Sequence, residues 1–224
     1  MTLTRIGGLA ALTCAATYLI GFALLVTLLA PLGFGTGEID PVAVGAFIDA
    51  RPGVLIAWNT TIYIVNALAL TVLAVALAEH MAQLPGWAAV TRAYGLIWAA
   101  LVLGAGMIAN VAVERAVHLY PQDPEAAANL WAMLHAVELG LGGGNEIAGG
   151  VWISCVSLAG LIGRGLPRPI AWIGLFTGLG GLVTLVPALG DAAGAVFGLG
   201  AIGWFLGVGV ALLTTGNDAK AAAT

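Results

Sequence analysis

Residues 6–30 read IGGLAALTCAATYLIGFALLVTLLA, an apolar run that contains no charged residue. About 20 apolar residues in an α-helix cross the roughly 30 Å hydrocarbon core of a bilayer. The hydrophobic part of a cleaved signal peptide is only about 7–15 residues long, so this run is too long to be one. We therefore expect residues 6–30 to form a retained first membrane span.

The whole chain, like residues 6–30, is rich in hydrophobic residues and poor in charged ones. Of the 224 residues, 61% are hydrophobic and 8% are charged, and the mean hydropathy is +1.04. An ordinary soluble domain is about a quarter charged, so this chain cannot cover a water-facing surface. The formal net charge is only −4 and there is no basic run, which excludes nucleic acid as a partner. The sequence predicts an integral membrane protein, with membrane lipid among its partners.

Charged residues, prolines and glycine clusters divide the chain into further apolar runs. The expected spans are six, at about 6–30, 54–79, 92–117, 144–163, 169–189 and 192–214. A chain of this kind is predicted to be all-α: a polytopic transmembrane helix bundle that forms a single transmembrane domain over residues 1–224.

The basic residues predict how these spans are oriented, because cytoplasmic loops carry an excess of lysine and arginine. With the N-terminus inside, the outer loops hold only Arg51 and Arg115. The cytoplasmic segments then hold Arg5, Arg92, Arg164, Arg168 and Lys220. Both termini are therefore expected in the cytoplasm.

Short helices are also expected in the outer loops. Asp40-Pro41 and Asp123-Pro124 each place an N-capping acid before a proline suited to the first helical turn. The first helix would reach Arg51. The second either runs straight into the fourth span or kinks at residues 140–144, GLGGG, where glycine permits a bend.

Polar residues form stripes on three consecutive predicted spans, because residues four apart share a helix face. The stripes are Asn59, Tyr63 and Asn66 on the second span, Asn110, Glu114 and His118 on the third, and His135, Glu138 and then Asn145 or Glu146 on the fourth. Counting 1.5 Å per residue places Asn59, Asn110 and Glu146 at similar heights near the outer edge of the hydrocarbon. Polar side chains in lipid face protein or a water-filled cavity, so we expect an outward-opening pocket between these spans.

Two chemistries are open for such a pocket. In the first, Glu146 or Glu114 acts as a carboxylic acid that protonates a lipophilic substrate, while Asn59, Asn110 and Asn145 orient it. Tyr63 and Asn66 would bind substrate beside them. Trp58 and Trp131, near the ends of their spans, suit an aromatic belt and would border the pocket at that height.

In the second chemistry the pocket holds a metal ion as cofactor. His118, His135 and Glu138 are ligand types for zinc, with Glu114 and Glu146 nearby in the predicted layer. No HExxH motif is present, and the Glu-x-x-His spacing of bundle di-iron proteins is also missing from the sequence. The alternative to both chemistries is that these side chains only tie helices together by hydrogen bonds.

Glycines four residues apart recur in the second half of the chain. The pairs are Gly140 and Gly144, Gly174 and Gly178, Gly194 and Gly198, and Gly203 and Gly207. Small residues at this spacing let helices approach closely, either across a homodimer or inside one bundle. Both interpretations stay open at this point.

Two stretches resemble a known family. Residues 143–150 read GGNEIAGG and lead into a span, and residues 166–175 read LPRPIAWIGL. They are similar to the second half of the bacterial six-span family known as domain of unknown function 4386, which has a glycine-rich fourth span and a short basic loop with proline. The resemblance implies the six-span layout and the inner (cytoplasmic) membrane of a bacterium, and it implies no reaction. The polar Asn145-Glu146 pair departs from the apolar version of the motif.

Three functions follow as hypotheses. The first is a protein that binds or transforms a lipophilic small molecule in the pocket, which leaves open whether it is an enzyme. The second is a transporter or channel for an uncharged solute, because the midplane positions carry almost no charge. The third is an accessory subunit whose glycine-rich helices pack against a partner.

Overall fold

A computed structural model describes residues 2–35, 39–143, 146–163 and 165–221, and in these ranges the chain is helical with no strand. The elements are α1 (Leu3–Leu24), η1 (Leu25–Leu29), η2 (Ala30–Leu32), α2 (Pro41–Ala50), α3 (Pro52–Asn59), η3 (Thr60–Val65), α4 (Asn66–His80), α5 (Pro85–Leu119), α6 (Pro124–Glu138), η4 (Leu139–Gly143), α7 (Ile147–Gly163), α8 (Arg168–Val183), η5 (Pro187–Leu189) and α9 (Gly190–Ala221). The prediction of an all-α fold is confirmed.

Five helical stretches of the described chain are long and apolar enough to cross a membrane. They are Leu3–Leu32, Pro52–His80, Pro85–Leu119, Pro124–Gly163 and Pro187–Thr214. Each contains one of the predicted spans. The remaining predicted span, 169–189, coincides with α8, which has 16 residues and is shorter than the about 20 that a span perpendicular to the bilayer needs.

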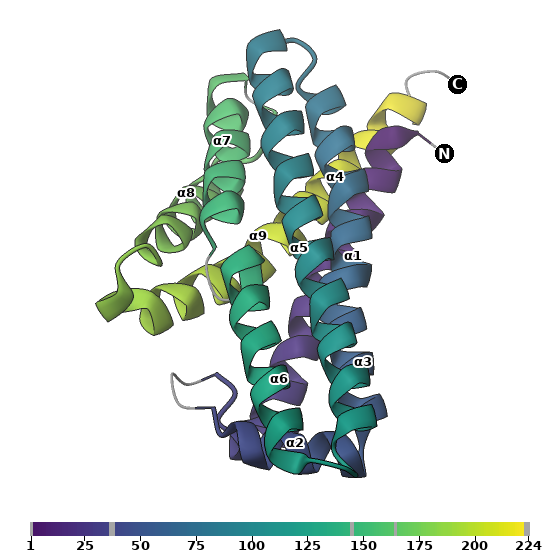
Figure 1. The fold of residues 1–224 in the computed structure, drawn as a ribbon. Coiled ribbons are helices and arrows are strands. Elements are labelled where there is room, and N and C mark those ends of the chain that lie inside the picture. Colours follow the sequence, from purple (N-terminus) through teal and green to yellow (C-terminus); the bar gives the residue numbers. More distant parts are fainter. Residues whose placement is uncertain (1, 36–38, 144–145, 164, 222–224) are drawn as a thin grey trace.

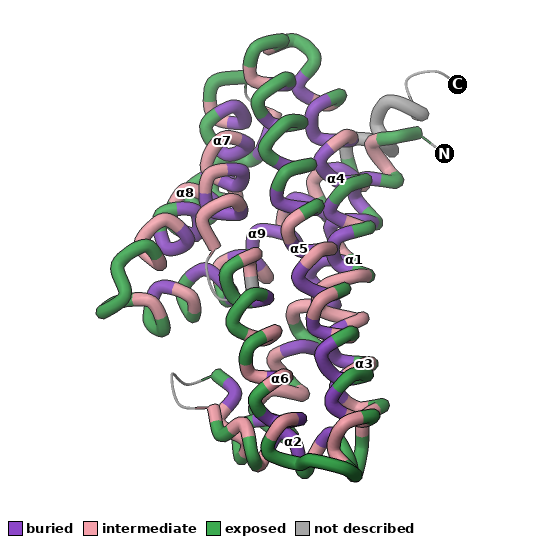
Figure 2. Tube along the Cα trace, in the orientation of Figure 1, coloured by how far each residue is buried: buried purple, intermediate pink, exposed green. Residues whose placement is uncertain are grey.

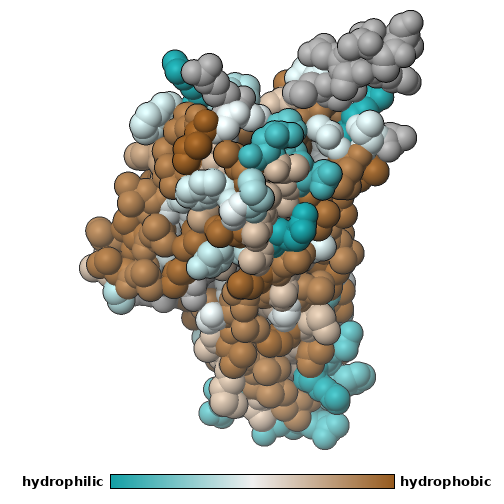
Figure 3. Space-filling model, turned by 90° about the horizontal axis from the view of Figure 1, so that it is seen from above, coloured by the Kyte–Doolittle hydropathy of each residue, from teal (hydrophilic) through white to brown (hydrophobic). Residues whose placement is uncertain are grey.

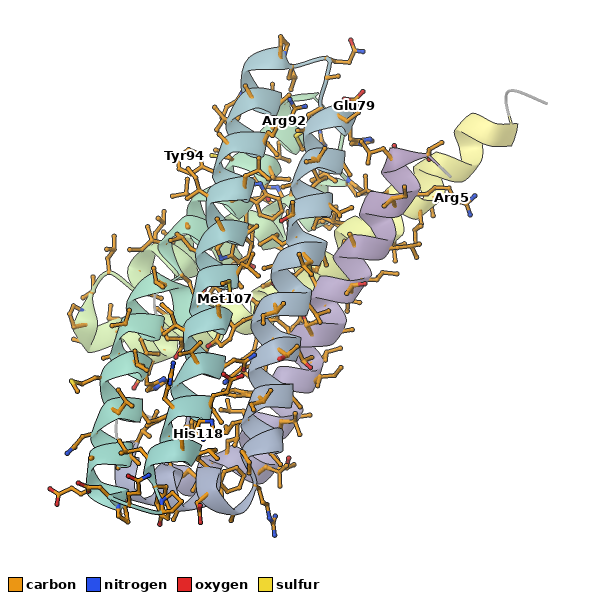
Figure 4. All side chains as sticks on the ribbon, turned by 45° about the vertical axis from the view of Figure 1, so that its right-hand side comes forward. Arg5, Glu79, Arg92, Tyr94, Met107 and His118 are labelled. Carbon is orange, nitrogen blue, oxygen red and sulfur yellow. The ribbon has the colours of Figure 1, made fainter. Side chains whose placement is uncertain are left out.

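The helices form an elongated bundle (Figure 1). Both termini and the α4–α5 turn lie at one end, and α2 and the α5–α6 turn lie at the other. Figure 4 shows Arg5, Glu79 and Arg92 toward the first end and His118 toward the second. On α5 no charged residue lies between Arg92 and Glu114, a rise of about 33 Å that matches the hydrocarbon thickness.

Burial follows the pattern of an integral membrane bundle. Figure 2 shows the buried residues on the sides of the helices that face each other, with exposed residues on the outer sides and at the ends. Exposed positions include many large apolar side chains, such as Phe176 (67%) and Trp172 (63%). Figure 3 looks onto one end and shows hydrophilic patches within a largely hydrophobic surface. An apolar outer face of this kind is suited to lipid rather than to water.

The short helices predicted in the loops are present. The Asp40 carboxylate accepts hydrogen bonds from the backbone N–H groups of Val42 (2.9 Å) and Ala43 (3.2 Å) at the start of α2. Asp123 caps α6 in the same way, accepting from the N–H of Ala126 at 2.9 Å. Each acid satisfies N–H groups that have no partner within the helix.

The segment that holds the fourth predicted span is bent rather than straight. Between α6 and α7, Gly142 has a φ of 138°, a conformation that only glycine adopts without strain. Of the two alternatives left open, a straight helix or a kink at residues 140–144, the structure has the kink, at Gly142, while residue 144 lies outside the described residues. The bend directs α6 toward one end of the bundle and α7 toward the other (Figure 1).

Some of the paired glycines pack inside the chain. A Cβ added at Gly178 would collide with Ser154 of α7, and one added at Gly174 would collide with Ser157 of α7. A Cβ added at Gly203 would meet no packing atom within 4 Å. Close packing within one bundle therefore accounts for Gly174 and Gly178, and a homodimer face stays a prediction.

The close approach of the α7 and α8 backbones gives a first testable prediction. A Cβ added at Gly150 of α7 would lie 2.7 Å from the carbonyl oxygen of Gly178 in α8, so the two backbones would have to separate. We expect Gly150→Ala to lower the free energy of unfolding by about 1–3 kcal/mol, seen as a lower Tm in detergent. Gly203→Ala is the matched control and should leave the Tm equal or slightly higher. Equal Tm values for both variants would contradict this packing.

Candidate functional site

A cavity of about 530 Å³ lies inside the bundle, on the half of the molecule that holds α3 and α6. Its wall on α5 extends from Trp98 to Ala112, a rise of about 21 Å. It separates two apolar clusters, one around Trp98, Trp152 and Phe205, and the other around Leu55 and Trp131. Its volume is typical of sites for drug-sized ligands, about 300–1,000 Å³.

The walls come from more helices than the sequence indicates. Besides the expected α3, α5 and α6, the cavity is lined by α1 through Tyr18 and Phe22, by the loop at Phe34, and by the start of α9 through Asp191 and Gly194. Sequence reasoning did not place these residues at the pocket, because Tyr18, Phe22, Phe34 and Asp191 are isolated polar or aromatic residues in apolar or glycine-rich stretches and Gly194 has no side chain.

Two of the cavity-lining segments contain a π-helical turn beside the cavity, and a third contains the kink at Gly142. The π-turns are η1, which contributes Leu25 to the lining, and η3, which contributes Ile62 and Tyr63. π-turns are rare, are less favourable than α-helix and are found frequently at functional sites. They change the rotation of the following residues, and here η3 joins α3 to α4 between Asn59 and Asn66.

The polar centre of the cavity is the buried carboxylate of Glu138, which is 2% exposed. The Tyr63 hydroxyl donates to its Oε1 at 2.6 Å. Its Oε2 lies 2.7 Å from Nδ1 of His135, one helical turn before it on α6. The predicted stripes on the second and fourth spans therefore meet through a direct hydrogen-bonded chain of three side chains. Charge-assisted hydrogen bonds of this length are strong in a buried setting.

An aromatic wall surrounds this polar chain. The ring of His135 stacks on Trp131 with centroids 4.8 Å apart and planes at 14°. Phe34 contacts Trp58, Trp131 and His135 with centroid separations of 5.5, 6.0 and 5.9 Å. Trp58 and Trp131 are 9% and 5% exposed. They are therefore interior cavity residues, and the aromatic-belt interpretation is wrong for both.

Two further predicted residues line the cavity without a side-chain hydrogen bond among the described residues. They are Asn59, which is 6% exposed, and Glu146 just before α7. The backbone of Glu146 is held by the Thr184 hydroxyl, which accepts from its N–H at 3.2 Å. Asn66 also lines the cavity, but its amide donates to Thr17 of α1 at 2.7 Å and ties α4 to α1.

The stripe predicted on the third span does not reach the cavity. Asn110 donates to the Thr60 hydroxyl at 3.0 Å, and Glu114 and His118 are exposed on the outer side of α5. The side of α5 that faces the cavity carries small residues, Ala109 and Ala112, instead. Glu114 as a pocket acid is therefore a wrong prediction. Asn145 lies outside the described residues.

The predicted metal ligands are not brought together. His135 and Glu138 are paired, but His118 lies on the exposed face of α5 near the end of the bundle (Figure 4). Among the described residues no group of three histidine, cysteine, aspartate or glutamate side chains could hold a metal ion. His118, His135 and Glu138 as one metal site are corrected to a His135–Glu138 hydrogen-bonded pair.

Comparison of the chain with protein-family models, with curated proteins and with solved structures found no match. The resemblance to domain of unknown function 4386 stays a prediction.

Proposed function

We propose that this protein binds a lipophilic small molecule in the cavity between α1, α3, α5, α6 and α9, inside a membrane. The observation that carries the proposal is a ligand-sized cavity whose apolar walls hold a few convergent polar groups. Sites for small molecules have this composition: apolar walls fill the ligand's shape, and a small number of polar groups fix its orientation.

The polar groups divide into two kinds. The Tyr63–Glu138–His135 chain is already hydrogen-bonded and gives the site a rigid polar wall. Asn59 and Glu146 have no side-chain partner among the described residues and are available to a ligand. Glu146 is the residue we propose for acid catalysis if the ligand is transformed, because its carboxyl group lines the cavity.

The proposal also includes the orientation of the protein in the membrane and the route by which the ligand reaches the cavity. With both termini in the cytoplasm, the end that holds α2 and the α5–α6 turn faces outward, and the cavity approaches that side. On α5 its wall ends at Ala112, about 3 Å along the helix axis from the charged Glu114. A lipophile would therefore reach the site from the membrane near its outer surface.

Filling the cavity from α9 tests the proposal. Gly194 lines the cavity, and a Cβ added there would meet no packing atom within 4 Å, so a larger side chain can enter without displacing a neighbour. We expect Gly194→Trp to fold and to lose the lipophile that the wild-type protein retains. Native mass spectrometry of protein purified in mild detergent reads the bound molecule directly.

Gly203→Trp is the matched control on the same helix. It also has open space around an added Cβ, and it does not line the cavity. It should retain the lipophile as wild type does. Wild-type protein that is free of any bound molecule, or equal retention by both variants, would count against the proposal.

A further inference from the structure

We infer that the ligand is a flat, ring-bearing lipophile with a hydroxyl group, and that this hydroxyl donates a hydrogen bond to Nε2 of His135. The inference rests on the proposed function and adds the chemical class of the ligand. The observation behind the inference concerns one nitrogen atom of the His135 ring. Nε2 of His135 is buried and has no hydrogen-bond partner in the described structure.

With Glu138 as a carboxylate and His135 as a neutral imidazole, the contact between them assigns the roles of the two ring nitrogens. A carboxylate only accepts hydrogen bonds, so Nδ1, at 2.7 Å from Glu138 Oε2, is the protonated nitrogen. A neutral imidazole carries one proton, and Nε2 is then left with a lone pair. Tyr63 occupies the other carboxylate oxygen, which holds Glu138 in place. The pair therefore presents a hydrogen-bond acceptor with a defined direction.

A buried acceptor without a partner loses the hydrogen bond that it would make in water, and native structures rarely leave one unpaired. His135 lines the cavity, with 17% of its side chain exposed. A donor on a molecule bound in the cavity beside this ring would complete the hydrogen bond. The partner must be a donor, which selects a hydroxyl or N–H group over a ketone or an ether.

The aromatic walls of the cavity indicate the shape of the rest of the ligand. Phe34 and Trp131 contact the imidazole at centroid separations of 5.9 and 4.8 Å, Trp58 contacts Phe34 at 5.5 Å, and all three rings line the cavity. Aromatic faces and edges of this kind favour a second flat ring in offset-stacked or edge-to-face contact. A phenol or a hydroxylated conjugated ring satisfies both the acceptor and the walls.

A matched pair of probes tests the inference: 2-naphthol, which can donate, and 2-methoxynaphthalene, which cannot. Binding to the full-length protein in detergent is followed by quenching of tryptophan fluorescence. We expect 2-naphthol to bind about two to thirteen times more tightly than the ether, the range for one net hydrogen bond. In His135→Phe, which keeps a ring on Trp131, this ratio should fall to about one.

The outcomes separate the inference from the proposed function. If both probes bind wild type equally and Gly194→Trp abolishes both, the cavity binds lipophiles and the inference about His135 is wrong. If the preference for 2-naphthol survives in His135→Phe, the acceptor is another residue and the inference is again wrong. Binding of neither probe overturns the inference and counts against the proposed function.

A spectroscopic measurement covers the case in which His135→Phe does not fold. The chain has only three histidines, so ¹⁵N signals of the imidazoles can be assigned in wild-type protein. Nε2 of His135 should give the shift of an unprotonated nitrogen and should move when 2-naphthol is added, but not when the ether is added. A protonated Nε2, or a signal that 2-naphthol leaves unchanged, would overturn the inference.

Discussion

Replacing Glu138 by leucine is expected to lower the free energy of unfolding by about 2–4 kcal/mol, because two buried donors lose their acceptor at once. The Tyr63 hydroxyl and Nδ1 of His135 both bond to this carboxylate, at 2.6 and 2.7 Å. Leucine of similar size fills the space but accepts no hydrogen bond. Thermal unfolding in detergent measures the loss.

Glu114→Leu is the control for this change. Glu114 is also a helical glutamate in a predicted polar stripe, but it is exposed and does not line the cavity. Its replacement should leave the Tm nearly unchanged. If Glu138→Leu and Glu114→Leu have equal Tm values, the hydrogen-bonded chain between η3 and α6 is not a stabilising feature of the fold.

Replacing Trp152 by alanine is expected to be the most damaging single change, with a loss of about 3–5 kcal/mol. Trp152 is fully buried, and its Nε1 donates to the backbone carbonyl of Thr91 at 2.8 Å. Its ring contacts Trp98 and Trp204 at 5.6 and 5.5 Å. Alanine would leave a cavity at the junction of α5, α7 and α9, and the Thr91 carbonyl would lose the hydrogen bond from the indole N–H.

Trp172→Ala is the matched comparison, because Trp172 is 63% exposed on the outer face of α8. Trp172→Ala should lower the free energy of unfolding by less than about 1 kcal/mol. A similar loss for both tryptophans would mean that α8 faces a packed protein surface rather than lipid, and would support the homodimer prediction.

The overall fold could be predicted because the bilayer allows few solutions. An uncharged run such as residues 6–30 must be helical in lipid, and α1 with η1 and η2 covers it. The capping acids Asp40 and Asp123 marked helix starts correctly. What the sequence did not indicate is that α8 is only 16 residues long, because apolarity continues beyond its end through Leu185 and Val186.

The candidate site could be predicted where both partners lie on one helix face. His135 and Glu138 are three residues apart, which places their side chains together whatever the packing. The prediction failed on α5, because a polar stripe does not say which side of a helix is buried. Small residues at Ala105, Ala109, Ala112 and Ala116 form the buried side there. That spacing was a readable signal for close packing.

The positions of polar residues along the bundle axis were easier to predict than the side of the helix on which each of them faces. Asn59 and Glu146 line the same cavity, as counting 1.5 Å per residue implied. Asn110 lies beside them in height but is bonded to Thr60 and faces elsewhere. The π-turn η3 lies between Asn59 and Asn66 and shifts the residues after it, and no residue pattern in the sequence marks such a turn.

The most direct test of the central claim is a crystal structure of the wild-type protein grown from a lipidic mesophase. The account predicts an open cavity with density for a bound lipophile between Trp131 and Glu146, and a polar atom of that molecule within hydrogen-bond distance of His135 Nε2. A cavity closed by the rings of Phe34 and Trp131, with no space for a ligand, would contradict it.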